Sequence, residues 1–416
     1  MRVYKPSGIE WLGEIPQSWE NVSIRSCFTE SNQRCNTDSY PLLSVTIANG
    51  IIYQDDIENK KDISNDDKSN YKIVPLNAVA YNKMRMWQGA VGVNTLTTGI
   101  VSPAYIVAIP NEKILPNFVS YLFKSKIMIG EFDKNSYGLC LDMNNLRYDD
   151  FRNIKIPLPP LQEQKEIAEF LDSKCEKIQN YIDKKQKLIT LLQEKKQALI
   201  NEVVTKGLNP NIESKNSGIA YLGLIPHHWE VKKLKHICKI NPQTNETLPN
   251  NFVYIDLESV AKGQLLKEQT INKEQAPSRA QRILQKQDIL FQLVRPYQRN
   301  NYIFNKNGDY VASTGYAQIR TKECVNFVYY ALLENSFVER VILKSTGSNY
   351  PAITSNDFAD LKIPLPPLQE QKQIANFLDE KCEKINSAIE KTKKQIELIK
   401  EYKNTLINEA VCGRIR

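Results

Sequence analysis

The sequence lacks long apolar runs. No stretch of 18 apolar residues occurs in its 416 residues, which excludes a membrane-spanning helix. Its first residues, Met1 to Ser7, lack the apolar core of a signal peptide. Eight cysteines are scattered without a CxxC pair, which is not the pattern of a disulfide framework. We therefore expect a chain of the reducing cytoplasm, without a membrane partner.

The sequence also lacks catalytic signatures. It has no GxxxxGK[ST], HExxH or GxSxG motif, and its 16 glycines are too sparse for a dinucleotide loop. An amino-methyltransferase would carry an Asn/Asp-Pro-Pro-aromatic site, but the only Pro-Pro pairs stand in Leu-Pro-Pro-Leu. Three histidines lie near Cys238 with a spacing that fits no standard zinc site, so structural roles are favoured. These absences predict a non-catalytic chain that holds no metal or cofactor.

Composition allows several folded domains and leaves the partner open. The length predicts two to four domains, and 41% apolar residues are enough for packed cores. The net charge of +8 permits a nucleic-acid partner. However, residues 1–153 carry 16 basic and 17 acidic residues, whereas residues 211–360 carry 18 and 14. The first block is therefore not a generic basic DNA binder, and any DNA contact must come from local loops.

The chain is a tandem repeat. Residues 154–178 recur as 361–385 with 21 of 25 positions identical, and both copies contain IPLPPLQEQ followed by FLD. Residues 8–20 recur as 218–230 with 8 of 13 identical. The segments between these anchors share little sequence. We therefore expect two variable blocks, 1–153 and 211–360, each followed by a near-duplicate segment, 154–210 and 361–416.

Each near-duplicate segment predicts a long helix. Prolines exclude a helix through Ile156–Pro160, but Pro160 suits a first helical turn and nothing breaks the helix before Gly207. Apolar residues, counting Cys175 and Cys382, then recur at heptad spacing over more than four heptads, which is typical of a coiled coil. The predicted seam comprises Leu171, Ile178, Ile182, Ile189, Leu192 and Leu199 in the first copy, and Leu378, Ile385, Ile389, Ile396, Ile399 and Leu406 in the second.

The two helices have to find a partner. A helix of about 45 residues spans roughly 65–70 Å, and such a helix with a polar outer face is not stable alone. We expect the two copies to pair with each other as an antiparallel coiled coil, with a pseudo-two-fold relation between the repeats. The alternatives are that each helix packs only on its own block, or that it packs on another chain.

Both variable blocks predict mixed α/β structure, which gives an α+β fold class. The expected strands are 40–53, 78–81 and 104–109 in the first block, and 252–260, 288–294 and 317–319 in the second. Helical periodicity covers 118–130 and 327–343. Because the order of elements is the same, we expect one fold with two different surfaces.

Two pairs of loops are candidates for DNA contact. One pair follows a strand in each block and combines basic, amide and aromatic residues, which suit guanine, adenine and base stacking respectively. The other pair offers hydroxyls and backbone N–H groups for phosphates. The predicted residues are Lys83, Arg85, Trp87, Gln88, Ser136 and Tyr137 in the first block, and Gln292, Arg295, Tyr297, Gln298, Arg299, Asn300, Ser348 and Tyr350 in the second. Alternatively, Trp87 and Tyr297 belong to the core, the arginines pair on the surface, and the second loops are simple turns.

The doubled IPLPPLQEQ…FLD motif, each copy after a variable block, and the Gly-Ile…Leu-Gly…Ile-Pro…Trp-Glu openings resemble the specificity (S) subunits of type I restriction–modification systems. The resemblance covers essentially the whole chain. It implies a non-catalytic DNA-recognition subunit, in which each variable block is a target recognition domain for one half of an asymmetric, two-part site in double-stranded DNA. It implies further that the helices set the spacer and dock two methyltransferase (M) subunits.

The resemblance also implies what the partners contribute. S-adenosylmethionine, ATP and Mg²⁺ would belong to the methyltransferase subunits and to restriction (R) subunits, whose complex methylates adenine and cleaves DNA. The family defines no fixed set of base-contacting residues, so the loop residues above rest on their own chemistry. Two other hypotheses remain: a self-contained DNA enzyme whose site the motifs do not reveal, and a coiled-coil scaffold without DNA contact.

Overall fold

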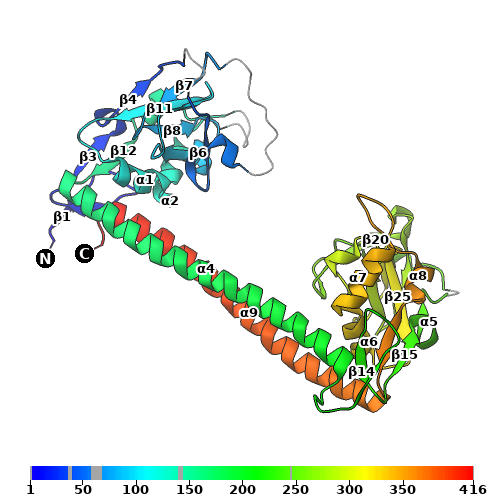
Figure 1. Cartoon of the computed structure of the whole chain (residues 1–416). Helices are drawn as coiled ribbons and strands as arrows, with labels where there is room; N and C mark the ends of the chain where they lie inside the picture. The colour runs from blue at the N-terminus through cyan, green and yellow to red at the C-terminus, as the bar shows by residue number, and fades with distance from the viewer. Residues whose placement is uncertain (1, 36–39, 58–67, 139–143, 244–245, 416) are drawn as a thin grey trace. The chain divides into compact units, whose positions relative to one another are not determined.

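The computed structural model describes residues 2–35, 40–57, 68–138, 144–243 and 246–415. Its contacts divide the chain into two units (Figure 1). Unit 1 comprises residues 1–185 and 394–416, and unit 2 comprises residues 186–393. Each unit therefore contains one variable block together with a part of both long helices.

Unit 1 is built on a four-stranded antiparallel sheet with the order β4-β11-β8-β9. Four two-stranded sheets, β1-β2, β3-β12, β5-β6 and β7-β10, surround it. Its elements are β1 (Tyr4–Pro6), β2 (Glu14–Pro16), β3 (Glu20–Ser23), η1 (Ile24–Ser26), β4 (Phe28–Ser31), β5 (Leu43–Thr46), β6 (Gly50–Tyr53), η2 (Gln54–Asp56), β7 (Lys72–Val74), β8 (Val79–Asn82), η3 (Met86–Gln88), β9 (Val91–Val93), β10 (Gly99–Val101), β11 (Tyr105–Pro110), α1 (Pro116–Lys124), α2 (Lys126–Lys134), α3 (Tyr148–Phe151), β12 (Lys155–Leu158) and the first part of α4 (Leu161–Lys206).

Unit 2 repeats this sheet as β16-β25-β22-β23 and adds a second, mixed sheet with the order β20-β17-β24-β21. Two-stranded sheets β13-β14, β15-β26 and β18-β19 complete it. Its elements are β13 (Ser214–Asn216), β14 (Leu224–Pro226), β15 (Glu230–Lys233), α5 (Leu234–Ile237), β16 (Cys238–Ile240), β17 (Asn251–Ile255), β18 (Val260–Ala261), β19 (Gln264–Leu265), β20 (Gln269–Asn272), η4 (Lys273–Gln275), β21 (Ala280–Ile283), β22 (Ile289–Gln292), η5 (Pro296–Gln298), β23 (Tyr302–Ile303), β24 (Tyr310–Ser313), β25 (Tyr316–Thr321), α6 (Val325–Leu332), α7 (Asn335–Lys344), α8 (Ser355–Ala359), β26 (Lys362–Leu365) and the first part of α9 (Leu368–Val411).

The predicted mixed α/β blocks are confirmed, with three corrections. The segment 252–260 is not one strand, because β17 ends at Ile255 and a turn separates it from β18. The segment 40–53 is a hairpin rather than one strand, because the chain turns between β5 and β6, where Gly50 has a φ of 68°. The helical segments 118–130 and 327–343 are each two helices. The first divides at Ser125, whose hydroxyl caps α2 by accepting from Met128 N–H. The second divides before α7, which Glu334 caps by accepting from Ser336 and Phe337 N–H.

The long helices α4 and α9 pair antiparallel within each unit, as predicted (Figure 1). In unit 1, Phe170 of α4 and Ala410 of α9 line the same pocket. Further along α4, Cys175 lies close enough to Lys403 of α9 for the lysine charge to affect its thiol. In unit 2 the Lys196 ammonium donates to Asn386 Oδ1 at 3.0 Å. The residue number of the partner in α9 therefore decreases as the residue number in α4 increases, as it must for antiparallel helices.

None of the twelve predicted seam side chains is exposed. Leu192, Leu199, Ile385 and Ile399 are half-buried, and the others are buried. The alternative in which each helix packs only on its own block is wrong, although the paired helices also contact the blocks. In unit 2, Val204 of α4 and Leu378 of α9 share one core with Phe327 of α6. Paired helices therefore also form part of the core of the block.

Two buried glutamines of the repeated LQEQ motif join each block to its long helix. Gln164 is 0% exposed, and its side chain accepts from Leu115 N–H at 2.7 Å while donating to Lys113 O at 2.9 Å and Pro159 O at 2.8 Å. Leu115 is the residue that precedes α1. The side-chain amide thus satisfies backbone groups at the start of α1 and of α4 together.

Gln371 repeats this clamp in unit 2. It accepts from Cys324 N–H at 3.0 Å, directly before α6, and donates to Pro366 O at 2.9 Å and to Glu323 Oε2 at 2.8 Å. We call the contacts of Gln164 and Gln371 the glutamine clamps. They explain why a glutamine stands at this place in both copies of the motif.

The aspartates of the repeated FLD motif add a second tie. Tyr121 of α1 donates to Asp172 Oδ1 at 2.6 Å, and Tyr330 of α6 donates to Asp379 Oδ1 at 2.8 Å. Burial, reinforced by the aspartate partner, raises the pKa of both phenols far above its usual value. The phenols therefore remain donors over the whole range in which the protein is handled.

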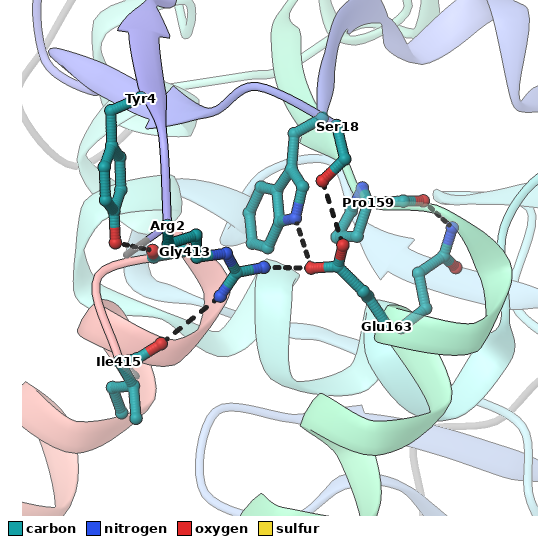
Figure 2. Close-up of polar contacts among 9 residues, drawn as sticks. Arg2, Tyr4, Ser18, Pro159, Glu163, Gly413 and Ile415 are labelled. Carbon is teal, nitrogen blue, oxygen red and sulfur yellow. Dashed lines mark hydrogen bonds and ion pairs between the residues drawn. The ribbon is translucent and has the colours of Figure 1, made fainter.

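The glutamate of the motif receives the opening segment of each repeat. In unit 1, Glu163 accepts from Trp19 Nε1 at 2.8 Å and Ser18 Oγ at 2.9 Å and pairs with Arg2 (Figure 2). In unit 2, Glu370 Oε2 lies 2.7 Å from His228 Nε2. Trp229 Nε1 there is buried without a partner among the described residues.

A glycine follows each long helix and lies close to the tryptophan of one of the two opening segments. Gly207 follows α4 with a φ of 76°, and a Cβ there would lie 3.2 Å from the Trp229 ring. Gly413 follows α9 with a φ of 74°, and its Cβ would lie 3.1 Å from the Trp19 ring and 2.6 Å from Pro16 Cδ. Both positions require glycine, because the left-handed backbone and the close approach exclude a side chain.

The glutamine clamp predicts a large stability cost for Gln164→Leu. Leucine keeps the volume but leaves Leu115 N–H and two backbone carbonyls without their buried partner. We expect the free energy of unfolding to fall by about 1–3 kcal/mol, as measured by denaturant titration. The control is Gln162→Leu, whose exposed side chain donates to Glu166 Oε1 and whose replacement should cost less than about 0.5 kcal/mol. Equal costs for both variants would contradict the clamp.

Candidate nucleic-acid interface

The predicted loops occupy equivalent places in the two units. One loop follows β8 and contains the 3₁₀ helix η3, and the other follows β22 and contains η5. β8 and β22 are both third in the shared sheet order. We call residues 83–90 loop 1 and residues 293–301 loop 2. Two loops on one scaffold therefore differ in side chains rather than in position.

In each unit the structure brings the two predicted loop segments together. Lys83 of loop 1 accepts from Leu146 N–H at 2.8 Å, and Tyr137 pairs with Asn145 next to it. Arg295 of loop 2 donates its N–H to Pro351 O at 2.7 Å, directly after Tyr350. The two segments predicted separately thus form one surface in each unit.

Loop 1 presents Arg85 and Gln88, whose side chains are exposed, beside the exposed Tyr137. Lys83, Trp87 and Ser136 are half-buried. Trp87 is thus neither a core residue nor free, and its Nε1 donates to Met84 O at 3.1 Å. The hydroxyl of Ser136 donates to Phe132 O at 2.7 Å in the last turn of α2 and does not face outwards.

Lys124, which was not among the predicted residues, anchors loop 1. Its ammonium donates to Thr46 O at 3.1 Å, Ile47 O at 2.7 Å and Gly89 O at 3.0 Å. It thereby ties the β5–β6 turn to the end of loop 1. Burial lowers the pKa of Lys124 to about 8, because the charged form loses hydration. A lone lysine in a helix carries no sequence signal for such a role.

Gln292 supports loop 2 from beneath. Its side chain is 1% exposed, donates to Gln298 Oε1 at 2.8 Å and accepts from Asn300 N–H at 3.2 Å. Asn301, which is also buried, accepts from Gln292 N–H at 2.9 Å. These bonds fix the shape of the loop, and they use the amide groups of Gln292 that were predicted to contact DNA.

Arg299 connects loop 2 to the long helix α4. Its guanidinium donates to Asn335 Oδ1 at 2.7 Å and Leu333 O at 3.3 Å. Gln197 of α4 donates to the same Leu333 O at 2.9 Å, and Asn201 of α4 accepts from Asn335 N–H at 3.1 Å. Burial lowers the pKa of the Arg299 guanidinium from its usual value. A continuous set of hydrogen bonds thus connects loop 2 to α4 through Leu333 and Asn335.

Loop 2 carries backbone strain at two positions. Arg295 has φ 56° and ψ 53°, and Arg299 has φ 55° and ψ 35°, so η5 stands between two left-handed residues that are not glycine. Such a conformation costs about 1–2 kcal/mol for each residue. Strain of this kind persists only where surrounding contacts impose it, and it concentrates at functional sites.

The outer surface of loop 2 is aromatic and basic. The Arg295 guanidinium lies 4.2 Å from the centroid of the Tyr350 ring. Tyr350 is 65% exposed and Tyr297 51% exposed, so neither is a core residue. Gln298 and Ser348 are exposed, and Asn300 is half-buried. DNA contact by these residues stays a prediction, as it does for loop 1.

The remaining candidate groups have structural surroundings. Cys175 and Cys382 are buried, and burial raises the pKa of both thiols. Within the residues that the structure describes, no group of three or more His, Cys, Asp or Glu side chains is placed to hold a metal ion. The described helices also include none that is long and apolar enough to span a membrane.

Comparison with known proteins gives one consistent result. A family model described as type I restriction modification DNA specificity domain matches residues 16–193 and again residues 226–398. Two specificity subunits of type I restriction enzymes from Methanocaldococcus jannaschii are similar in sequence. MjaVIII is 28% identical over 76% of this chain and 75% of its own length, and the putative MjaX is 26% identical over 97% and 95%.

Solved structures share the fold. A chain from a study of complex assembly and conformational transition of the type I R-M system matches with a TM-score of 0.71 at 17% identity, covering 96% of this chain and 99% of that one. The HsdS subunit of Thermoanaerobacter tengcongensis matches with a TM-score of 0.55 at 18% identity, covering 96% and 98%.

The anchoring of loop 1 predicts a pH-dependent stability. Because the pKa of Lys124 falls from 10.5 to about 8 on folding, the unfolded chain binds more protons between these two values. The contribution of Lys124 to stability should therefore rise as the pH increases from about 8 to about 10.5. The measurement is the difference in unfolding free energy between the native chain and Lys124→Met across this range. A difference that stays constant or falls as the pH increases would contradict the lowered pKa of Lys124.

Proposed function

The chain belongs to the type I restriction–modification DNA specificity domain family, whose model covers both of its repeats, and from this premise we propose how it recognises DNA. It is the specificity subunit of a type I restriction–modification complex. Each unit reads one half of an asymmetric, two-part site in double-stranded DNA. Loop 1 and the segment around Tyr137 contact one half-site, and loop 2 and the segment around Tyr350 contact the other.

The observation that carries this proposal is the equivalent placement of two loops that share residue types suited to DNA and differ in their other residues. Arg85, Trp87 and Gln88 stand in loop 1 where loop 2 has Arg295, Tyr297 and Gln298. Arginine pairs with guanine O6 and N7, and glutamine with adenine N6 and N7, while aromatic rings stack on bases. The two sets have the same spacing, but Gly89 and Ala90 follow the first set whereas Arg299 and Asn300 follow the second. Because the surrounding side chains and the supports of the loops differ, the two half-sites should differ and the whole site should not be a palindrome.

The paired helices set the distance between the half-sites and dock two methyltransferase subunits. Support for docking comes from exposed apolar residues on the outer faces of α4 and α9. Leu191 is 50% and Leu398 is 55% exposed, and these two leucines occupy the same position in the two repeats. Each has an exposed apolar neighbour one turn away, Leu188 and Tyr402. A duplicated exposed position suits two copies of one partner.

Chemistry in the complex belongs to the partners. The methyltransferase subunits bind S-adenosylmethionine and methylate adenine, and the restriction subunits use ATP and Mg²⁺ for cleavage. This chain supplies sequence selection. It contributes to the reaction by placing the target adenine, since a bound and oriented substrate lowers the barrier that the partner must overcome.

A methyl-transfer assay tests this division of labour. The purified chain with labelled S-adenosylmethionine and DNA should transfer no label, and addition of its methyltransferase subunits should give transfer that depends on DNA sequence. Robust transfer by the chain alone would show a self-contained enzyme instead. Partner subunits that bind equally well but methylate without sequence preference would show a scaffold that does not touch DNA.

The spacer role predicts the effect of lengthening both helices. One heptad inserted after Lys185 in α4 and one after Lys393 in α9 keeps the seam in register and adds about 10 Å of helix. The preferred spacer should grow by about three base pairs, since each occupies 3.4 Å, and both half-sites should stay the same. The readout is methylation of DNA substrates with graded spacers.

The matched control replaces seven residues at each of these places without a change in length. It should leave the preferred spacer as it is. An altered half-site, or a spacer preference that ignores the insertion, would count against the helices as the spacing element.

A further inference from the structure

We propose that Arg295 is the specificity-determining residue of unit 2 and that it reads a guanine in the major groove through both of its Nη groups. This inference rests on the proposed function and deepens it, because the family match assigns no residue to any base. It singles out one side chain of loop 2 from several arginines and amides with similar chemistry.

The Arg295 guanidinium is fixed by a ring contact, but its N–H groups have no hydrogen-bond partner among the described residues. It lies on the ring of Tyr350, 4.2 Å from the centroid, and its Nε is buried without a hydrogen-bond partner among the described residues. No described residue accepts a hydrogen bond from its Nη groups or forms an ion pair with it. The charge is therefore oriented by stacking, and its donors remain available to a ligand.

Two other arginines of unit 2 are already occupied. Arg299 donates to Leu333 O and Asn335 Oδ1, and Arg320 forms a bidentate pair with Asp288 at 2.8 and 2.9 Å. Arg299 therefore acts as a positioning residue that holds the loop on α4, even though its sequence context is as suggestive as that of Arg295. The contrast separates the arginine that shapes the loop from the one that the loop presents.

The backbone fixes where the Arg295 side chain starts. Its backbone, with a φ of 56°, is held by the N–H bond to Pro351 O at 2.7 Å, and the following Pro296 is buried. A side chain that is held at both its Cα and its guanidinium loses little further freedom on binding. Preorganisation of this kind favours a directional contact over a loose one.

Guanine is the base that matches this group. It presents two acceptors, O6 and N7, on its major-groove edge, and the two parallel N–H groups of a guanidinium bond both at once. A phosphate also accepts such a fork, but it carries no sequence information. The distinction can be measured, because a phosphate contact weakens binding to all sequences alike.

The experiment uses the full chain in complex with its methyltransferase subunits. Its methylation rate is measured on the recognised site and on every single-base change of that site, for the native chain, Arg295→Ala and Arg295→Lys. We expect the preference for guanine at one position of one half-site to fall by about ten- to a hundredfold in both variants. Binding of Arg295→Lys to random-sequence DNA should change by less than about threefold, because the charge is kept.

The matched control is Arg340→Ala. Arg340 also lies over a tyrosine, with its guanidinium 6.0 Å from the Tyr221 ring, but it stands on α7 outside loop 2. This variant should keep every base preference. Tyr350→Leu, which removes the ring under Arg295, should reduce the same guanine preference that Arg295→Ala abolishes, whereas Tyr350→Phe should retain it.

The half-site read by unit 1 serves as an internal check, since its unchanged preferences show that each variant is folded and assembled. An unchanged guanine preference in Arg295→Ala, or a uniform loss of binding to all sequences, would overturn the assignment while leaving the proposed function intact. A native complex without any base preference would instead refute the proposed function itself.

Discussion

The two glutamine clamps are the contacts on which the rest of this structure depends. Gln164 and Gln371 are almost completely buried, and each bonds backbone groups that precede two helices at once. A buried polar group without its partners is costly, so only one arrangement of block and helix satisfies them all. The clamps therefore fix each block on the long helix that follows it in sequence. Apolar packing of Leu171 or Leu378 supplies the burial but would tolerate a slide of the helix, whereas the amide does not.

A fixed base of this kind allows the outer loops to differ. Loop 1 is held by Lys124 from α1, whereas loop 2 is held by its own Arg299, which bonds Asn335 of α7, and Asn335 in turn bonds Asn201 of α4. The two units thus solve the same positioning problem with unrelated side chains. The left-handed residues of loop 2 fit this interpretation, because strain at Arg295 and Arg299 needs a rigid surrounding to persist. The loops can therefore differ between the units, while the glutamine clamps that position the blocks are the same in both.

Much of the architecture was predictable from sequence because it is periodic or duplicated. The heptad seam from Leu171 to Leu199 and its second copy indicated two paired helices, and the structure has them. The breaks at Ser125 and before Asn335 were missed, since apolar periodicity continues across both and only the local capping bonds reveal them. The role of Gln164 was missed as well. Its identity in both repeats was the available signal, but a glutamine near a helix start reads as surface polarity unless its distant partners are known.

The candidate interface was predictable in outline and not in detail. Loops 1 and 2 were identified by the residue types that suit DNA, and the structure places them equivalently. Which residues face outwards could not be read from that composition. Gln292 and Arg299 have the same chemistry as Gln298 and Arg295, yet the first two are held by Asn300 and Asn335. Burial and hydrogen bonding between residues far apart in sequence decide this, and no local pattern encodes it.

The central claim is that two units on one frame read two different half-sites. A map of methylated adenines across the genome of a host that carries this system tests it most directly. We expect a single motif made of two unlike half-sites separated by a constant number of unspecified bases, with one methylated adenine on each strand. A palindromic motif, a single continuous site, or methylation without a constant spacer would contradict it.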